Sequence, residues 1–256
     1  MRAPVTIPAL AKQYGSVTWK AVESVAVFPE LGLAYNRIKK NANTSVMILL
    51  RQLAYGVVDS RKEAKRKSKT LLDLSLAELR SLDPLHLFVV IRNPYSRVLS
   101  AFLDKFRDES YRRRYGTFDL TPDGFGQFLV WVERGGLTRN GHWNLQTSRM
   151  ISSKLETYDT VIRFERFRDE LVDMLRARDI AIPEDCLREL YPSDQTKRTD
   201  ASTKLHAYYN AERRDRVASI YASDFALLDY PIDFHLPVAA SNDDACRGGA
   251  AEKPDA

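Results

Sequence analysis

The stretch LGLAYNRIKKNANTSVMILLRQL, residues 31–53, joins two patterns of secondary structure through a short polar segment. Residues 31–38 show partial apolar alternation, which predicts a strand that ends at the polar segment. The apolar residues that follow recur at helical spacing, as in a helix with one buried face. They are Val46, Leu49, Leu50, Leu53 and Val57. We therefore expect a strand, a loop and a helix in this order.

A second stretch, LHLFVVIRNPYSRVLSAFLDKF at residues 85–106, repeats the same order. Its continuous apolar run, residues 85–91, is typical of a strand covered on both faces of a sheet. Pro94 suits the first turn of a helix, where its missing N–H is not needed. The core-facing residues of that helix are expected to be Tyr95, Leu99, Phe102, Leu103 and Phe106. Two such units predict an α/β fold with parallel strands.

Further elements are expected downstream, in one domain over residues 31–238. Residues 121–134 predict a helix, 158–164 a short strand, 165–178 a helix, and 207–230 a helix followed by a shorter packed segment. Residues 1–30 are assigned to an N-terminal segment and 239–256 to a disordered tail. The charge run at residues 60–70 is interpreted as a solvated linker or mobile loop, or alternatively as a guide for an anionic substrate.

The composition sets only broad limits on function. The chain has 256 residues, 44% of them hydrophobic, and a formal charge of +5, which favours anionic partners weakly. Its two cysteines, Cys186 and Cys246, lie far apart and suggest neither a disulfide framework nor a metal site. No run of about 18 apolar residues occurs. We expect a soluble, cytoplasmic protein without an integral membrane segment.

The polar segment KKNANTS, residues 39–45, has the features of an anion-binding loop. Backbone N–H groups at a helix start, a lysine (Lys40) and the hydroxyls of Thr44 and Ser45 together suit a phosphate-type anion. Capping of the helix by these hydroxyls is the alternative. A Walker loop needs glycines and a lysine directly before the hydroxyl. No glycine lies between Gly32 and Gly56, which disfavours hydrolysis of nucleoside triphosphates.

A second anion site is suggested at the end of the second strand. Arg92 offers a planar fork of donors, and Ser100 lies eight residues further on in the following helix. The alternative is that Arg92 pairs with a carboxylate such as Asp104 and that Ser100 is a neutral surface residue.

Both segments resemble motifs of one enzyme family. RNPYSRVLSAFLDKF, from Arg92, resembles the 3'-phosphate-binding segment Arg-x-Pro-x-x-Arg-x-x-Ser-x-[Tyr/Phe] of sulfotransferases that use 3'-phosphoadenosine 5'-phosphosulfate (PAPS). KKNANTS resembles their 5'-phosphosulfate loop, Pro-Lys-x-x-x-Thr-Ser, with Lys39 in place of the proline. GHWNLQTSRM, YDTVIRFERFRDEL and IYASDFALLDY are similar to the C-terminal half of carbohydrate sulfotransferases of the family 2 type. The resemblance covers most of residues 31–230.

The resemblance implies a P-loop-like three-layer fold and PAPS as co-substrate. The sulfuryl group would go to a hydroxyl of a carbohydrate or glycolipid, with no metal and no nucleic acid involved. Lys40 would neutralise the leaving group, and Arg92 and Ser100 would hold the 3'-phosphate. The residues expected at the 5'-phosphosulfate are Lys40, Asn41, Ala42, Asn43, Thr44 and Ser45.

His142, in NGHWNLQ, matches a family histidine on the acceptor side and is our candidate general base. A structural hydrogen bond is its alternative role. Glu165 is the second candidate base, although it could instead position Arg163 or cap the next helix. The other histidines, His86, His206 and His235, lie at a strand start, a helix start and near the tail.

Two other functions remain open on the sequence. One is a nucleotide-dependent kinase or other phosphotransferase. The other is a non-catalytic polyanion-binding protein that uses the basic stretches Arg61 to Lys69 and Arg112 to Arg114.

Overall fold

The computed structural model describes residues 18–57, 60, 63–64, 68–75, 77–78, 85–189 and 199–233. Within them lies a four-stranded sheet of order β1-β2-β3-β4. Its strands are β1 (Val25–Phe28), β2 (Leu33–Asn36), β3 (His86–Ile91) and β4 (Thr160–Arg163). β1 is antiparallel to β2, whereas β2 is parallel to β3 and β3 to β4. The α/β class with a mainly parallel central sheet is therefore confirmed.

The helices predicted from apolar periodicity are present, with shifted ends. They are α3 (Asn43–Tyr55), α6 (Pro94–Lys105), α8 (Pro122–Trp131), α9 (Phe167–Arg176), α12 (Ala211–Ile220) and α13 (Ala222–Leu227). Shorter α-helices of the described residues are α2 (Trp19–Val22), α7 (Glu109–Tyr115), α10 (Glu184–Glu189) and α11 (Leu205–Tyr208).

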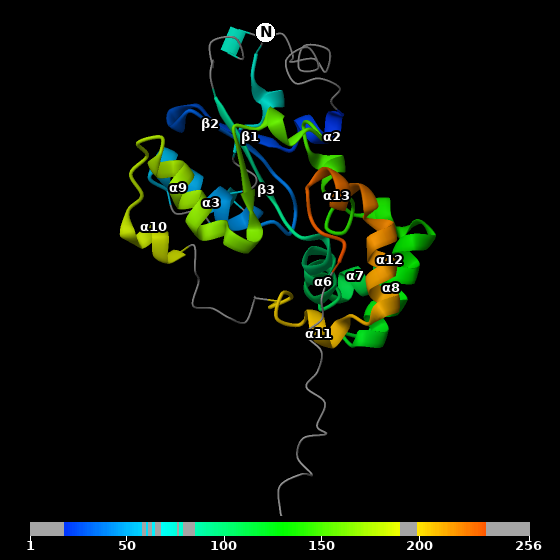
Figure 1. The fold of residues 1–256 in the computed structure, drawn as a ribbon. Helices are drawn as coiled ribbons and strands as arrows, with labels where there is room; N and C mark the ends of the chain where they lie inside the picture. The colour runs from blue at the N-terminus through cyan, green and yellow to red at the C-terminus, as the bar shows by residue number, and fades with distance from the viewer. Residues whose placement is uncertain are drawn as a thin grey trace, which may run out of the picture.

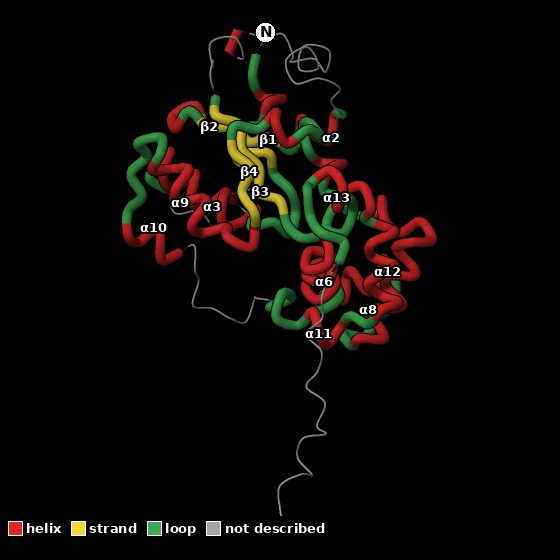
Figure 2. Tube along the Cα trace, viewed as in Figure 1, coloured by secondary structure: helices red, strands yellow, loops and turns green. Residues whose placement is uncertain are grey.

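The two faces of the sheet carry separate hydrophobic clusters, which makes the fold three-layered. Leu87, Val89 and Ile91 of β3 pack with α6, α8, α12 and α13, whereas Phe88 and Val90 pack with α3 and α9. Figures 1 and 2 show these two groups of helices on opposite sides of the strands. Side chains of a strand alternate between faces, so a strand covered on both must be continuously apolar.

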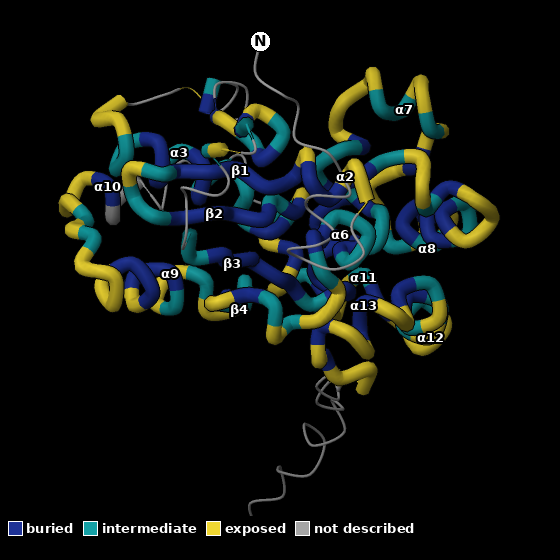
Figure 3. Tube along the Cα trace, turned by 90° about the horizontal axis from the view of Figure 1, so that it is seen from above, coloured by how far each residue is buried: buried dark blue, intermediate teal, exposed yellow. Residues whose placement is uncertain are grey.

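Burial follows this layering. Strands β1 to β3 are buried, whereas the outer surfaces of α7 and α12 are exposed (Figure 3). Helix α6 is buried almost all round, so that its polar residues Ser96, Arg97 and Ser100 lie inside the protein with its apolar ones. A hydrogen bond of 2.9 Å from the Tyr95 N–H to the Asn93 side chain caps its start, and Pro94 follows as the first helical residue.

Strand β1 was not predicted, because its apolar run of four residues, VAVF, is too short for a periodicity argument. It pairs with β2 from Val25↔Asn36 to Phe28↔Leu33, and all four of its residues are buried. The sheet thus includes residues that precede position 31.

The charge run at residues 60–70 is only partly described. Ala64 is fully buried against the cluster that includes α3, Ser68 is also buried, and Thr70 forms an isolated bridge with Ala26. The prediction of a solvated linker is wrong at these positions, because one small apolar residue among the charges reaches the core. Arg61, Lys62 and residues 65–67 lie outside the described residues, as do residues 1–17 and the predicted tail, 239–256, with Cys246.

Candidate active site

Parallel strands bring the two sequence motifs to the same edge of the sheet. Asn36 at the end of β2 pairs with Val89 of β3, so the loop after β2 and Arg92 after β3 emerge side by side. Ligands bind at this edge, outside the carboxyl ends of the strands, in open α/β sheets. A cleft of about 470 Å³ lies there. It is lined by Lys39, Lys40, Ala42, Asn43, Thr44, Ser45, Arg92, Ser100, Asp104, Lys105, His142, Phe164 and residues 199–203.

The loop between β2 and α3 turns sharply without glycine. Lys40 (φ 72°) and Ala42 (φ 53°) both adopt the left-handed backbone conformation, and Ala42 is the N-cap of α3. No side chain caps this helix, so the capping alternative for Thr44 and Ser45 is wrong. Both residues lie in the first turn of α3 and line the cleft. Left-handed backbone at a residue with a Cβ costs about 1–2 kcal/mol, and surrounding contacts must stabilise it.

Two buried arginines and one asparagine supply those contacts. Arg97 Nε donates to the Lys39 carbonyl at 3.2 Å, and Arg92 Nη1 donates to the Lys40 carbonyl at 3.0 Å. Asn41 Nδ2 donates to the Val90 carbonyl at 2.8 Å. The loop is therefore held against β3 and α6 although Lys39 replaces the proline of the motif. The Asn41 side chain points into the protein and does not line the cleft, in contrast to its neighbours.

Arg92 faces both the loop and the cleft. Its Nε donates to Ser96 Oγ at 3.0 Å, and its guanidinium carbon lies 3.9 Å from the centre of the Phe164 ring. Burial lowers the pKa of Arg92 to about 10, an effect that the charge of Glu165 opposes, so the group is a cation at neutral pH. The alternative partner Asp104 pairs with Lys40 instead.

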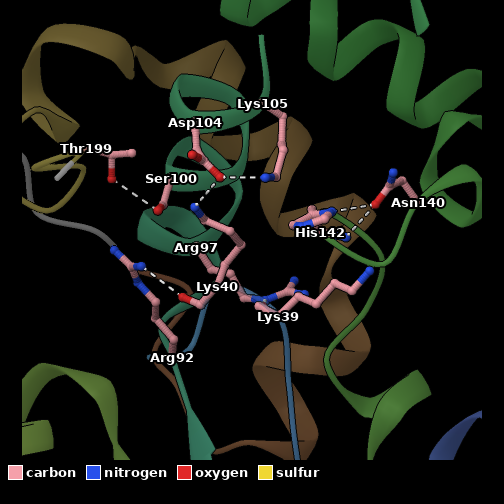
Figure 4. Close-up of polar contacts among 10 residues, drawn as sticks. All are labelled: Lys39, Lys40, Arg92, Arg97, Ser100, Asp104, Lys105, Asn140, His142 and Thr199. Atoms are coloured by element: carbon pink, nitrogen blue, oxygen red, sulfur yellow. Dashed lines mark hydrogen bonds and ion pairs between the residues drawn. The ribbon is translucent and has the colours of Figure 1, made fainter. Parts of the chain in front are cut away.

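Ser100 is buried, not a surface residue, and its hydroxyl lies 3.1 Å from Thr199 Oγ1. Figure 4 shows Thr199 beside Ser100. Thr199 belongs to the segment 199–203, TDAST, which lines the cleft with Ser100. We did not predict a role for this segment. Its hydroxyl-rich composition was the available signal, but nothing in the sequence places it beside α6.

Lys40 carries the charge of the loop into the cleft. Its Nζ lies 3.0 Å from Asp104 Oδ2, and Lys105 Nζ lies 2.9 Å from the same oxygen (Figure 4). Burial lowers the pKa of Lys40 to about 8, although the charge of Asp104 and the hydrogen bond to it raise this pKa. Burial raises the pKa of Asp104, but Lys40 and Lys105 outweigh it and lower this pKa to about 2.

His142 is held in one tautomer by Asn140. Its Nδ1 lies 2.6 Å from Asn140 Oδ1, and its own backbone N–H donates to that same oxygen at 3.1 Å. Because the backbone N–H can only donate, the oxygen is an acceptor and Nδ1 carries the proton. Nε2 then keeps its lone pair. Burial, then the charges of Lys105, Lys39 and Lys40, lowers the pKa of His142 to about 2, so the ring is neutral at physiological pH.

Glu165 does not line the cleft. Its Oε1 accepts from the Asn93 N–H at 2.9 Å and its Oε2 from the Tyr230 hydroxyl at 2.8 Å. This carboxylate therefore holds the start of α6 against the C-terminal part of the domain. It neither pairs with Arg163 nor provides a side-chain cap for α9, since Arg163 pairs with Asp229 at 3.3 Å.

The remaining histidine candidates and the α7 arginines that the structure describes lie outside the cleft. His86 is at the opposite end of β3, with Nε2 2.7 Å from Thr160 Oγ1, and His206 is an exposed residue of α11. Arg112 and Arg113 of α7 lie 3.7 and 3.8 Å from Asp119 and Glu109, respectively. His235 lies outside the described residues.

Gln146 connects the two motifs, and we did not predict this. Its fully buried side chain accepts from Asn41 Nδ2 at 2.6 Å and from the Arg92 N–H at 3.0 Å, and donates to the Arg92 carbonyl at 2.8 Å. Buried Asp224 in turn accepts from the Gln146 N–H at 2.8 Å. These residues fall in the NLQTS and IYASDF segments quoted above, but their partners cannot be read from the sequence.

Geometry and charge together define the class: a P-loop-like α/β protein with a cleft lined by Lys39, Lys40, Arg92 and Lys105 at the carboxyl edge of its sheet. The model of the sulfotransferase family matches residues 23–231. The chain belongs to this family, and its general activity is sulfotransfer. No curated protein and no solved structure matched the chain in the same comparisons.

The described part of the chain lacks two further features. No group of three or more His, Cys, Asp or Glu side chains there is placed to hold a metal ion. No helix there has the length and apolarity needed to cross a membrane.

Proposed function

We propose that this sulfotransferase takes the sulfuryl group of PAPS and transfers it to a hydroxyl of a carbohydrate or glycolipid. One observation carries the donor assignment: the loop of Lys40 and the pair Arg92 and Ser100 line a single cleft. Arg92 joins them through its bond to the Lys40 carbonyl. Two separated cationic groups suit a donor with phosphates at both its 5' and 3' positions.

In this proposal the first turn of α3 receives the 5'-phosphosulfate. The backbone N–H groups at the start of a helix of 13 residues, with the hydroxyls of Thr44 and Ser45, provide donors to its oxygens. Arg92 and Ser100 hold the 3'-phosphate, which ATP lacks. Lys40 leaves Asp104 to neutralise the leaving phosphate.

The transfer itself forms one sulfur–oxygen bond and breaks another. The acceptor hydroxyl oxygen attacks the sulfur in line, and the bond from sulfur to the bridging 5'-phosphate oxygen breaks. The hydroxyl proton goes to Nε2 of His142, and the negative charge of the departing phosphate is stabilised by Lys40. The products are a sulfate ester and adenosine 3',5'-bisphosphate.

His142 can act as the base because Asn140 holds the Nδ1 proton and Nε2 keeps its lone pair. With its pKa lowered, the ring accepts the proton only as the new sulfur–oxygen bond makes the hydroxyl acidic. Glu165, with both carboxylate oxygens engaged away from the cleft, is assigned a positioning role for Asn93 and α6.

Calorimetry with adenosine 3',5'-bisphosphate and with ATP tests the donor, and transfer of label from PAPS to a panel of sugars tests the acceptor. We expect tighter binding of the bisphosphate and label on at least one sugar. Preference for ATP would instead support a phosphotransferase. Binding of neither nucleotide, with salt-sensitive binding of polyanions, would support a polyanion-binding protein.

A further inference from the structure

Arg97 has no role in the proposed function, although it lies on the face of α6 that carries Ser100 and Asp104, at spacing i, i+3 and i+7. Its side chain is 1% exposed, so the guanidinium lies inside the protein. A buried cation is costly unless its donors are bonded and an opposite charge lies nearby. The bonds of this group therefore indicate what it does.

The guanidinium bonds to two segments that lie far apart in the chain. Its Nε donates to the Lys39 carbonyl at 3.2 Å, in the loop that carries Lys40. Its Nη1 donates to the Asn144 carbonyl at 2.8 Å and its Nη2 to the Gly141 carbonyl at 3.5 Å, on either side of His142. All three acceptors are backbone oxygens. One side chain thus holds the backbone of both loops, the one with Lys40 and the one with His142.

The loop that carries His142, residues 140–147, is also held by a second set of buried bonds. Tyr221 Oη donates to the Trp143 carbonyl at 2.5 Å. Asp224 accepts from the backbone N–H groups of Gln146 and Thr147 at 2.8 and 3.1 Å. Burial lowers the pKa of Arg97, and the charge of Asp224 opposes this effect. The loop therefore connects a buried cation, which binds its carbonyls, with a buried anion, which binds its N–H groups.

The separation of these two loops matters for the chemistry. Transfer in line places the acceptor hydroxyl, the sulfur and the leaving oxygen on one axis, with Lys40 at one end and His142 at the other. A displacement of about 1 Å can lower the rate of such a reaction by about 10². Arg97 bonds to both loops close to these residues, whereas the bond between Asn41 and Gln146 joins the loops further from His142.

We propose that Arg97 is a positioning residue for sulfuryl transfer, which sets the distance between Lys40 at the leaving phosphate and His142 at the acceptor hydroxyl. The inference rests on the proposed function, which supplies the roles of these two residues. Arg97 does not line the cleft and touches neither substrate. Its replacement should therefore lower the rate of transfer more than the affinity for either substrate.

The test uses two variants and a matched control, all in the full chain. Arg97→Lys keeps the charge but not the planar fork that reaches both loops. Arg97→Gln removes the same bonds without leaving a buried cation. The control, Tyr209→Phe, removes a buried hydrogen bond of 2.9 Å to the Tyr95 carbonyl of the same helix, at residues that do not line the cleft. Denaturant unfolding measures the stability of each variant.

Steady-state kinetics with labelled PAPS and calorimetry with adenosine 3',5'-bisphosphate give the first readout. We expect kcat of Arg97→Lys to fall by about 30-fold or more, with KM for PAPS and bisphosphate affinity within about threefold of the parent. Tyr209→Phe should keep kcat within about twofold, even at a similar loss of stability. In a His142→Ala background, Arg97→Lys should lower kcat further by less than about threefold, because the base that it positions is absent.

Nitrogen-15 NMR of the His142 imidazole gives a second readout, which needs no substrate. Because Nδ1 lies 2.6 Å from Asn140 Oδ1, the parent should show one tautomer, protonated at Nδ1. Both Arg97 variants should show signals averaged between the two tautomers, and Tyr209→Phe the signals of the parent. Comparison with His142→Ala assigns the resonances among the four histidines of the chain.

Four results would overturn the positioning role while the proposed function stands. They are a kcat of Arg97→Lys within about twofold of the parent, an equal loss with and without His142, as a purely structural role gives, and an imidazole spectrum unchanged in both variants. The fourth is averaged tautomers in the parent itself, a measurement that holds even if neither variant folds. A parent that does not bind bisphosphate would refute the proposed function, and the positioning role with it.

Discussion

Arg92 Nη1 donates to the carbonyl oxygen of Lys40 at 3.0 Å, which joins two motifs that lie 52 residues apart in the chain. One guanidinium thus holds the loop that precedes α3 and also faces the cleft. Its fork offers more donors than the two that Lys40 and Ser96 accept, and a ligand anion can take the others. Loss of this guanidinium should therefore weaken binding of both the 5'-phosphate and the 3'-phosphate of the nucleotide.

For Arg92→Ala we expect binding of adenosine 3',5'-bisphosphate to weaken by about 1.5–3 kcal/mol, the scale of a hydrogen bond to a charged group. Arg92→Lys should recover part of the loss, because it restores charge without the planar fork. Calorimetry measures both, with Arg113→Ala on the exposed helix α7 as control. Binding equal to that of the parent in Arg92→Ala would remove this residue from the donor site.

For Asp104→Asn we expect bisphosphate affinity to rise, by about 1 kcal/mol on the scale of partly solvated charge interactions. The carboxylate both repels an anionic donor and holds Lys40 Nζ, and the substitution removes both effects. Thermal unfolding should show a lower Tm, because Lys40 and Lys105 lose their shared partner. A decrease in affinity would show that Asp104 helps to place Lys40 for the ligand.

The pKa of Lys40, lowered to about 8, predicts an alkaline limit for donor binding. The amine must be protonated to attract the anion. Bisphosphate affinity should therefore be constant below pH 8 and fall towards tenfold per pH unit above it. Phosphate is already fully ionised there, since its second pKa is about 6. Calorimetric titrations with bisphosphate from pH 7 to 9.5 measure this change in affinity. Lys40→Arg, which stays charged, should not show the decrease; the same decrease in that variant would assign it to another group.

For His142→Ala we expect turnover to fall by about 10²–10⁴, the usual contribution of a general base, with bisphosphate affinity nearly unchanged. Steady-state kinetics measures the turnover, and calorimetry measures the bisphosphate affinity separately. Because the pKa of His142 is lowered to about 2, the parent should also show no loss of turnover near pH 6.5 as the pH falls to 5. Unchanged turnover in the alanine variant would leave His142 with a structural role.

For Gln146→Leu we expect a free energy of unfolding lower by about 1–3 kcal/mol, because the Arg92 backbone N–H and C=O lose buried partners. The loop should loosen as well, since Asn41 loses its bond to Gln146, and bisphosphate binding should weaken. Denaturant unfolding and calorimetry test this, with the exposed Gln127→Leu as control. A variant as stable as the parent would show that water or a neighbour replaces the lost amide.

Local sequence patterns determined the architecture of this protein. The apolar run 85–91 indicated a strand covered on both faces, and the helical spacing after it indicated a packed helix. Both patterns depend only on residues a few positions apart in the sequence. The two motif segments likewise indicated residues that line the cleft, namely Lys40, Ala42, Asn43, Thr44, Ser45, Arg92 and Ser100. Asn41 was expected there but its side chain points into the protein, and Lys105 of α6 was not predicted. Strand β1 escaped prediction because four apolar residues carry too little periodic signal.

Only the tertiary structure decided what each polar side chain meets. Ser100 faces Thr199, 99 residues away, and Gln146 contacts Asn41 and Arg92 across 105 and 54 residues. It also decided that Thr44 and Ser45 line the cleft without capping α3. Such partners are set by strand register and by how helices cover the sheet. No local pattern records them, because a hydrogen bond depends on the position of both groups in space.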